Sequence, residues 1–238
     1  MEQVLIIIPT YNEIENIEAI ITAVIEQSSS YHMLIVDDGS PDGTASKVRS
    51  MQTSYDSRLH LIERSGKLGL GTAYIAGFRF AIEHGYSCVM EMDADFSHNP
   101  KDVPRLIEAV KSDGVGMAVG SRYVKGGGFR NWSKYRLMLS YGASLYTRII
   151  TGMPVKDPTA GFVIYSLDVL KKMDLDKITF VGYAFQIEMK YYCYSLGYKI
   201  VEIPITFVDR ELGTSKMDMS IVQEGILGVL QMRFRKYV

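Results

Sequence analysis

The chain has 238 residues, of which 47% are hydrophobic and 22% charged, so it can form one α/β domain with a sizeable core. Its formal net charge of −1 argues against a nucleic-acid-binding protein, because such proteins usually carry a strong excess of basic residues. No apolar run approaches the roughly 18 residues that a membrane-spanning helix needs, so none is expected.

The N-terminus and the cysteines indicate the compartment. Residues 1–9 lack a basic region and a cleavage site, so we expect a first strand there and not a signal peptide. Cys88 and Cys193 have no metal-like or redox spacing, and we expect both to be buried reduced thiols. Reduced thiols suit a cytoplasmic protein.

Apolar runs of strand length alternate with helical patterns along the chain. The expected strands are 4–8, 33–36, 59–63, 88–92, 115–119, 162–165 and 200–207. Helices are expected at 14–26, 44–54, 72–84 and 101–112, and an amphipathic segment at 221–237. This alternation predicts an α/β fold in one compact domain, with a mostly parallel central sheet flanked by helices.

Two carboxylates, Asp93 and Asp95, stand at the end of the fourth expected strand. Residues i and i+2 of an extended segment point the same way, so both can converge on one hard cation such as Mg²⁺ or Mn²⁺. A lone Asp-x-Asp is also an ordinary turn sequence. Its place at the carboxyl end of a strand, where open α/β sheets bind ligands, favours a metal and diphosphate site. Asn99 and Pro100 are expected to start the next helix.

Polar side chains also follow the first two strands. Tyr11 and Glu13 follow the first, and Asp37, Asp38 and Asp42 follow the second. An aromatic ring and carboxylates could stack on a base and hydrogen-bond its edge and the ribose hydroxyls. The alternative is a turn cluster, and within it we expect Asp42 to start a helix and not to bind a ligand.

The sequence Lys67-Leu-Gly-Leu-Gly-Thr-Ala-Tyr74 resembles the start of a dinucleotide-binding fingerprint. Tyr74 occupies the place of the third glycine, and the motif follows the third strand instead of the first. The first turn, 9–13, contains no glycine that would let a pyrophosphate approach the backbone. A nicotinamide-dependent dehydrogenase is therefore disfavoured.

A basic segment, residues 121–156, contains no Asp or Glu but seven Lys or Arg, which are Arg122, Lys125, Arg130, Lys134, Arg136, Arg148 and Lys156. Tyrosine, leucine and methionine are interspersed among them. The alternatives are a solvated basic face and a surface that faces phosphates or an anionic membrane. A solvated face usually includes acidic residues as well, and here they are absent.

Taken together, seven motifs resemble those of the dolichyl-phosphate (polyprenyl-phosphate) mannose synthases, which belong to glycosyltransferase family 2 and have the GT-A nucleotide-sugar-binding fold. The resemblance runs from residue 4 to about residue 216. In the family's order the motifs are Ile8-Pro-Thr-Tyr-Asn-Glu13, Val36-Asp-Asp-Gly-Ser-Pro-Asp-Gly-Thr44, Lys67-Leu-Gly-Leu-Gly-Thr-Ala-Tyr74, Asp93-Ala-Asp-Phe-Ser-His98, Gly120-Ser-Arg-Tyr123, Gly182-Tyr-Ala-Phe-Gln-Ile-Glu188 and Phe207-Val-Asp-Arg-Glu-Leu-Gly-Thr-Ser-Lys216.

The resemblance implies inverting transfer of mannose from GDP-mannose to a polyprenyl phosphate, with Mg²⁺ or Mn²⁺, at the cytosolic face of a membrane. It divides the chain into a GT-A domain, 1–216, which includes the basic segment, and a C-terminal amphipathic helix, 217–238. Some relatives carry C-terminal transmembrane helices. This chain is more similar to catalytic subunits that bind the membrane peripherally and work with a small membrane-spanning partner.

The resemblance also assigns roles to individual residues. Those that would hold the nucleotide and its phosphates are Pro9, Tyr11, Glu13, Val36, Asp38, Asp93, Ala94, Asp95, Arg210 and Lys216. Asp93, Ala94 and Asp95 would bind the metal, and Arg122 and Arg136 the acceptor phosphate. The expected catalytic residues are Asp95, Arg122, Arg136 and Arg210. Archaeal members can have Gln at the position of Ser97, whose shorter side chain would reach a cation through water.

One position departs from the wider family. Many family-2 transferases use an Asp as general base, and Gln186 stands at the matching place. A neutral amide cannot take a proton, but a phosphate monoester, with a second pKa of about 6, is already largely a dianion near neutral pH. The departure predicts a mechanism without a general base. Gln186 and Glu188 are expected to orient the sugar or to pack the site.

Two alternatives remain. The first is transfer of glucose from UDP-glucose to a polyprenyl phosphate, within the same fold. The second is a catalytically silent subunit that binds a lipid or a nucleotide, against which the intact Asp93, Asp95, Arg122 and Arg210 argue.

Overall fold

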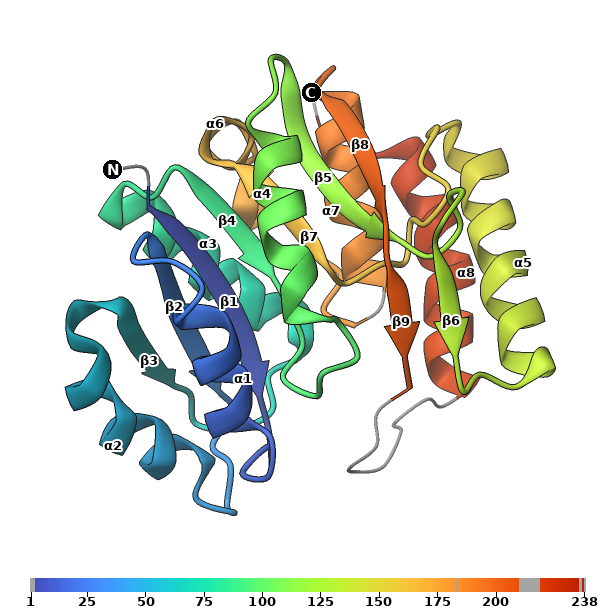
Figure 1. Ribbon diagram of the computed structural model, residues 1–238. Coiled ribbons are helices and arrows are strands. Elements are labelled where there is room, and N and C mark those ends of the chain that lie inside the picture. Colours follow the sequence, from blue (N-terminus) through green and yellow to red (C-terminus); the bar gives the residue numbers. More distant parts are fainter. Residues whose placement is uncertain (1–2, 183, 210–218, 236, 238) are drawn as a thin grey trace.

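A computed structural model describes residues 3–182, 184–209, 219–235 and 237 (Figure 1). Its centre is a seven-stranded sheet in the order β3-β2-β1-β4-β7-β5-β8. The strands are β1 (Val4–Thr10), β2 (Tyr31–Asp37), β3 (Leu59–Glu63), β4 (Cys88–Glu91), β5 (Val115–Ser121), β7 (Val163–Ser166) and β8 (Lys199–Pro204). Within this sheet β7 runs antiparallel to both of its neighbours, and the other pairs are parallel.

Helices cover both faces of the sheet (Figure 1). One face packs against α1 (Ile17–Ile25), α2 (Thr44–Tyr55) and α4 (Val103–Val110). The other packs against α3 (Leu70–His84), α6 (Leu167–Lys172), α7 (Ala184–Ser195) and α8 (Met219–Phe234). Because both faces are covered, β1 and β2 are apolar along nearly their whole length and do not alternate. The expected α/β class and mostly parallel sheet are thus confirmed.

The basic segment forms a separate layer at one edge of the molecule. It contains β6 (Gly128–Arg130) and α5 (Lys134–Thr151), and β6 pairs in parallel with β9 (Thr206–Val208) in a second, two-stranded sheet. Figure 1 places α5 at the outer edge, beside α8, with which it packs. Short 3-10 turns occur at Asp56–Arg58, Pro100–Asp102 and Leu175–Lys177.

The expected strand 200–207 is two strands, because the chain changes sheets at Ile205. The Ile205 amide donates to the Ser121 carbonyl at 3.0 Å, and its carbonyl accepts from the Gly128 amide at 3.0 Å. Pro204 has no amide hydrogen to continue the ladder of the main sheet. The break therefore joins the main sheet, through β9, to the basic segment.

Other sequence expectations are met locally. The Asn99 side chain accepts from the Lys101 amide at 3.0 Å, with Pro100 in the first turn, as predicted. Cys88 and Cys193 are both buried. No helix in the described ranges combines the length and the apolar character required to cross a membrane.

Candidate active site

The segment that follows β4 holds the two carboxylates of the Asp-Ala-Asp motif. The Asp95 carboxylate accepts from the Ser97 amide at 3.0 Å, and Phe96 has a positive φ of 58°. The Asp93 side chain is 43% exposed. The Ser97 carbonyl accepts from the Val208 amide at 3.2 Å, so the motif is fastened directly to β9. The Ser97 hydroxyl is buried and has no hydrogen-bond partner among the described residues.

His98 closes this turn from inside the core. Its ring stacks on Phe162, with centroids 4.9 Å apart, and meets Phe207 edge-on. Burial lowers the pKa of His98 to about 4, so the ring is neutral near pH 7. A neutral ring can accept a hydrogen bond, and His98 Nδ1 lies 3.4 Å from the Asp93 amide nitrogen, which donates to it. The histidine thus supports the backbone at Asp93.

The residues expected to hold a nucleotide meet where β1 and β2 end. Pro9 pairs with Val36 in the parallel ladder, and the Asp38 amide donates to Thr10 at 2.9 Å. Lys67 Nζ lies 3.9 Å above the centre of the Tyr11 ring. The Glu13 carboxylate accepts from Asn16 Nδ2 at 3.0 Å.

The carboxylates after β2 have separate partners. Asp37 is buried and accepts from the Thr10 hydroxyl at 2.8 Å and from the Ser40 amide at 2.8 Å, so it holds the turn. Asp38 forms a buried ion pair with Arg64. Asp42 accepts from the Thr44 amide at 3.0 Å, at the start of α2, which confirms it as a helix-start residue.

The glycines of the Lys67–Tyr74 motif allow close packing against segment 180–182. The Gly71 amide donates to the Val181 carbonyl at 2.9 Å. A Cβ atom at Gly71 would lie 2.7 Å from the Phe180 carbonyl oxygen, and Gly69 has a φ of +99°. Any other residue at either position would push the start of α3 away from segment 180–182. The two glycines are therefore explained by packing, without a dinucleotide.

Arg122 is held in a fixed orientation at the end of β5. Its Nε and Nη2 donate to the two oxygens of Asp157 at 2.7 and 2.6 Å, and Nη2 also donates to the Thr159 hydroxyl at 2.9 Å. The Arg122 side chain is 10% exposed and the Asp157 side chain fully buried. The Glu202 carboxylate accepts from the Asp157 backbone amide at 3.0 Å. This bond holds Asp157 in place.

Arg136, on the first turn of α5, has a similar support. Nη1 donates to Asp209 at 2.7 Å, and the guanidinium carbon lies 4.1 Å from the centre of the Trp132 ring. Arg136 Nε and Trp132 Nε1 are both buried donors without a hydrogen-bond partner among the described residues. Two unsatisfied donors that lie side by side are costly unless an acceptor such as a phosphate oxygen reaches them.

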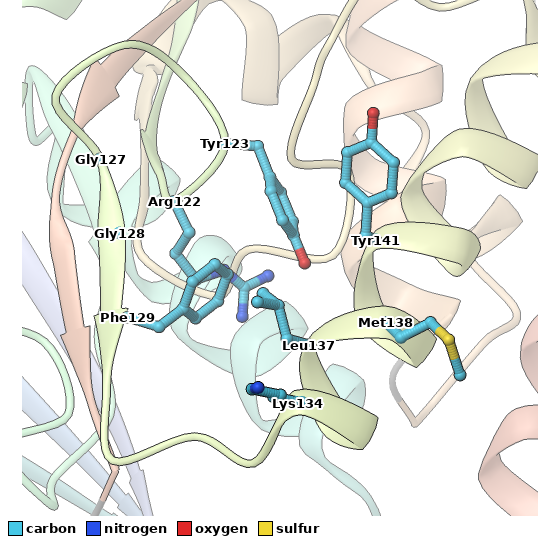
Figure 2. Close-up of a pocket in the computed structure, with 9 residues that line it drawn as sticks. All are labelled: Arg122, Tyr123, Gly127, Gly128, Phe129, Lys134, Leu137, Met138 and Tyr141. Carbon is cyan, nitrogen blue, oxygen red and sulfur yellow. The ribbon is translucent and has the colours of Figure 1, made fainter.

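A cleft of about 470 Å³ opens between the end of β5 and α5. Figure 2 shows Arg122 and Phe129 facing Leu137 and Lys134 of α5. Its lining consists of Arg122, Tyr123, Gly127, Gly128, Phe129, Lys134, Leu137, Met138 and Tyr141. The cleft therefore combines two cations with apolar and aromatic walls.

Behind the Asp-Ala-Asp motif lies a buried polar network. Glu91 accepts from Gln186 Nε2 at 2.6 Å and from the Tyr165 hydroxyl at 2.9 Å, and Gln186 Oε1 accepts from Lys190 Nζ at 3.2 Å. Burial raises the pKa of Glu91 to about 7 and lowers that of Lys190 to about 8. Both polar ends of Gln186 are thus engaged within the protein.

Glu188 is buried and structural. Its carboxylate accepts from the amides of Thr179 and Phe180, from Arg235 Nη1 at 2.9 Å and from the Tyr237 hydroxyl at 3.0 Å. These bonds tie the chain after α8 to segment 179–180. Of the two roles expected for Glu188, they favour packing over contact with a sugar.

The expected site residues therefore fall into three groups. Pro9, Tyr11, Glu13, Val36 and Asp38 meet at the β1 and β2 ends, and Asp93, Ala94 and Asp95 follow β4. Arg122 lines the cleft, and Arg136 lies on the first turn of α5. Arg210 and Lys216 lie outside the described residues. Within the described part of the chain, no three His, Cys, Asp or Glu side chains are arranged to hold a metal by themselves.

Several residues were missed by sequence reasoning. No role was assigned to Asp157, Trp132, Asp209, Glu91 or Lys190. Glu91 had a visible signal, since an acidic residue stands within an apolar strand. Lys190 follows Gln186 by one helical turn, which would also have suggested a pair.

Comparisons with known proteins identify the family of this chain. The model of the glycosyl transferase family 2 matches residues 5–178. Polyprenol monophosphomannose synthase of Mycolicibacterium smegmatis is 44% identical over 234 residues, 98% of this chain and 88% of that protein. Undecaprenyl-phosphate mannosyltransferase of Micrococcus luteus is 46% identical over 227 residues, 95% of this chain and 92% of that protein.

Solved structures give the same fold. Glucosyl-3-phosphoglycerate synthase from Mycobacterium tuberculosis, in complex with Mn²⁺, UDP and phosphoglyceric acid, is similar with a TM-score of 0.72 and 17% identity, over 99% of this chain and 80% of that chain. Its complex with Mn²⁺, UDP-glucose and phosphoglyceric acid gives 0.71 and 16%, over 98% and 80%. The likeness confirms the GT-A fold. With the family model matched over most of its length, this chain belongs to glycosyltransferase family 2 and is a glycosyltransferase.

Proposed function

We propose that this glycosyltransferase transfers mannose from GDP-mannose to a polyprenyl phosphate, with inversion at the anomeric carbon. The two relatives, named as polyprenol monophosphomannose synthase and undecaprenyl-phosphate mannosyltransferase, support this acceptor and this sugar. The observation that carries the proposal is the cleft beside Arg122, where a cationic group meets the apolar side chains of α5. A lipid phosphate has the same two parts, an anionic head and an apolar tail.

The donor would bind along the carboxyl ends of β1, β2 and β4. Tyr11 would stack on the base, and Glu13 and Asp38 would accept hydrogen bonds from the base edge and the ribose. Pro9 and Val36 would supply the apolar contact beside them. In the sequence-based assignment Arg210 and Lys216 would neutralise the donor phosphates, and Arg210 would assist departure of the leaving group.

The residues after β4 fit a divalent cation that is shared with the substrate. Asp93 and Asp95 offer carboxylate oxygens, the ligands that Mg²⁺ and Mn²⁺ prefer, and Ala94 holds the spacing between them. The buried, unsatisfied Ser97 hydroxyl adds a donor or acceptor beside them. Two carboxylates leave most of the coordination sphere to diphosphate oxygens and water. When bound, such an ion would neutralise the charge that develops on the leaving diphosphate.

On the acceptor side, Arg122 and Arg136 would position the phosphate. Asp157 fixes the guanidinium of Arg122, and Trp132 and Asp209 fix that of Arg136. The phosphate oxygen would attack the anomeric carbon, and the bond from that carbon to the diphosphate oxygen would break, its electron pair leaving with GDP. Fixed cationic groups place the nucleophile without reorganisation at the moment of reaction.

No general base is required in this scheme. The acceptor phosphate, with its second pKa near 6, loses its proton to solvent before the reaction. Gln186 is bonded to Glu91 and Lys190, and Asp157 to Arg122, so the partners of these side chains favour a scheme that does not use them as bases. The barrier would then be lowered by positioning and charge neutralisation.

The membrane would be met by α5 and α8. Exposed apolar side chains gather on these two helices, and they are Tyr135, Leu137, Met138, Leu139, Tyr141, Leu145 and Ile149 on α5 and Leu227, Leu230 and Phe234 on α8. The basic residues Lys125, Arg130 and Lys134 are exposed in the same layer. A peripheral position on the cytosolic face, alone or with a small membrane-spanning subunit, would let the lipid phosphate reach the cleft.

A transfer assay tests this function. The protein is incubated with a phosphorylated polyprenol and either GDP-mannose or UDP-glucose, with and without EDTA. The proposal predicts a mannosyl lipid from GDP-mannose that EDTA abolishes. A glucosyl lipid from UDP-glucose would favour the rival activity, and nucleotide binding without either product would favour a silent binding subunit.

A further inference from the structure

Lys190 is a buried lysine in α7 to which the proposed reaction assigns no role. Its side chain is fully buried, yet its ammonium group keeps three hydrogen bonds, to the Ala160 carbonyl at 2.7 Å, to the Gln186 carbonyl at 3.1 Å and to Gln186 Oε1 at 3.2 Å. Burying an ammonium is costly unless it is paired and hydrogen-bonded. An apolar side chain would fill the same volume without that cost.

Toward the donor side, Lys190 connects to the end of β4. Gln186 accepts from Lys190 and donates to Glu91, which also accepts from the Tyr165 hydroxyl. Glu91 is the last residue of β4, two positions before Asp93. The bonded chain from Lys190 therefore ends at the point where the polypeptide turns out of the sheet to present its two carboxylates.

Toward the acceptor side, Lys190 connects to segment 157–161. It holds the carbonyl of Ala160, the residue that follows Thr159, and both Thr159 and Asp157 bind the guanidinium of Arg122. The negative charges of Glu91 and Asp157 favour the protonated form of Lys190 and so raise its pKa, against the larger opposite effect of burial. Lys190 is thus connected through Gln186 to the carboxylate behind the donor site. Through Ala160 it is connected to the segment whose Asp157 orients the acceptor arginine.

We propose that Lys190 is a positioning residue that sets segment 157–161, and through it Arg122, at a fixed place relative to the end of β4. In-line transfer needs the acceptor phosphate and the donor diphosphate at a fixed separation. This lysine bonds directly to Ala160 in segment 157–161 and, through Gln186, to Glu91 at the end of β4. The inference rests on the proposed function for its catalytic consequence. Its structural consequence, the restraint of segment 157–161, can be measured independently.

The test uses three variants of the full chain. Lys190→Met removes the ammonium and keeps a side chain of similar length, and it leaves Glu91 without its cation. The double variant Glu91→Gln with Lys190→Met removes both charges, and Gln186 can then turn over to bond the amide at position 91. Lys172→Met makes the same change on α6, outside this network, and serves as the matched control.

We expect Lys190→Met to lower the melting temperature and the double variant to recover most of that loss, because no buried charge is then unpaired. Despite this recovery, the double variant should transfer mannose about 10 to 100 times more slowly than the wild type, because the acceptor phosphate is no longer held at the right place. Its affinity for GDP in the presence of Mn²⁺ should stay within about twofold of the wild type, since the carboxylates of the motif are retained. Backbone amides in segment 157–161 should exchange with solvent faster than in Lys172→Met.

Two results would overturn the role of Lys190. One is transfer that recovers together with the melting temperature, as expected of a residue that acts only through stability. The other is unchanged amide exchange in segment 157–161. A wild type that transfers no sugar to a polyprenyl phosphate would instead count against the proposed function, and amide exchange would still decide whether Lys190 restrains this segment.

Discussion

The guanidinium of Arg122 and the carboxylate of Asp157 form a buried pair with two parallel hydrogen bonds, of 2.7 and 2.6 Å. The arginine directly follows β5, and its partner lies 35 residues further along the chain. Asp157 also accepts from the Arg122 backbone amide at 2.9 Å, so the pair fixes both the side chain and the direction of the main chain. The cation that faces the cleft is therefore oriented before any ligand arrives.

Asp157→Asn should destabilise the protein and reduce transfer. The amide nitrogen of Asn would face a guanidinium donor, so one bond of the pair is lost and a buried charge loses its counterion. Breaking a buried pair costs about 3 kcal/mol or more in the free energy of unfolding. Urea denaturation measures this cost, and Asp176→Asn, in an exposed pair with Arg79, is the control and should change little. Equal effects of the two substitutions would contradict the structural role of the buried pair.

Asp95→Asn should abolish transfer while the fold survives. The Asn side-chain oxygen can still accept from the Ser97 amide, so the turn after β4 is kept. The charge that a hard cation requires is lost, and Mn²⁺-dependent binding of GDP should weaken by at least about tenfold. Calorimetric titration with GDP and Mn²⁺ measures the effect, with Asp113→Asn, in an exposed turn, as control. Unchanged GDP affinity and activity at low Mn²⁺ would rule out Asp95 as a ligand.

Transfer should show no essential protein base between about pH 6 and 9. The wild-type rate should rise with the second ionisation of the acceptor phosphate, near pH 6, and then level off. Gln186→Ala and Glu188→Gln should retain this profile at reduced rate, because both side chains are bonded within the protein, whereas Arg122→Ala should lose most of its acceptor affinity. A carboxylate variant that lost nearly all turnover, following that group's ionisation, with GDP binding intact, would require a base after all.

Part of the loss of stability in acid should come from a histidine pair remote from the site. His32 Nδ1 and His60 Nε2 lie 3.0 and 3.2 Å from the Tyr86 hydroxyl, and burial lowers the pKa of each histidine. Below about pH 6.5, the ordinary histidine pKa, these two histidines are protonated in the unfolded chain but still neutral in the folded protein. The free energy of unfolding should therefore fall as the pH drops from 6.5 toward the lowered pKa values, and His60→Gln should reduce that slope. Urea denaturation at several pH values measures it, and an equal slope in both proteins would refute the assignment.

Local sequence patterns were sufficient for the strand ends and the motifs they present. Asp95 and Asn99 accept hydrogen bonds from backbone amides only two residues away, and Asp93 belongs to the same short motif as Asp95. Spacing and turn chemistry therefore identify them. The α/β alternation also predicted the strands that these residues follow. The split at Ile205 was not visible, because it depends on partners in β5 and β6, more than 70 residues away in the chain.

The buried polar contacts could not be read from the sequence. Gln186 meets Glu91 across 95 residues, and Lys190 meets Ala160 across 30. Such pairs depend on which helix face meets which strand, a tertiary property that local periodicity does not encode. The Gly69 and Gly71 motif was similarly ambiguous, because its reason is the close approach of segment 180–182.

The most direct measurement of the central claim compares two acceptors that differ by one group. GDP-mannose and Mn²⁺ are supplied with either a polyprenyl phosphate or the same polyprenol without its phosphate, and the lipid products are identified by mass. The account predicts a mannosyl phosphate lipid from the first acceptor and no product from the second, because the nucleophile is a phosphate oxygen oriented by Arg122. Equal transfer to the alcohol, or no transfer to either lipid, would contradict it.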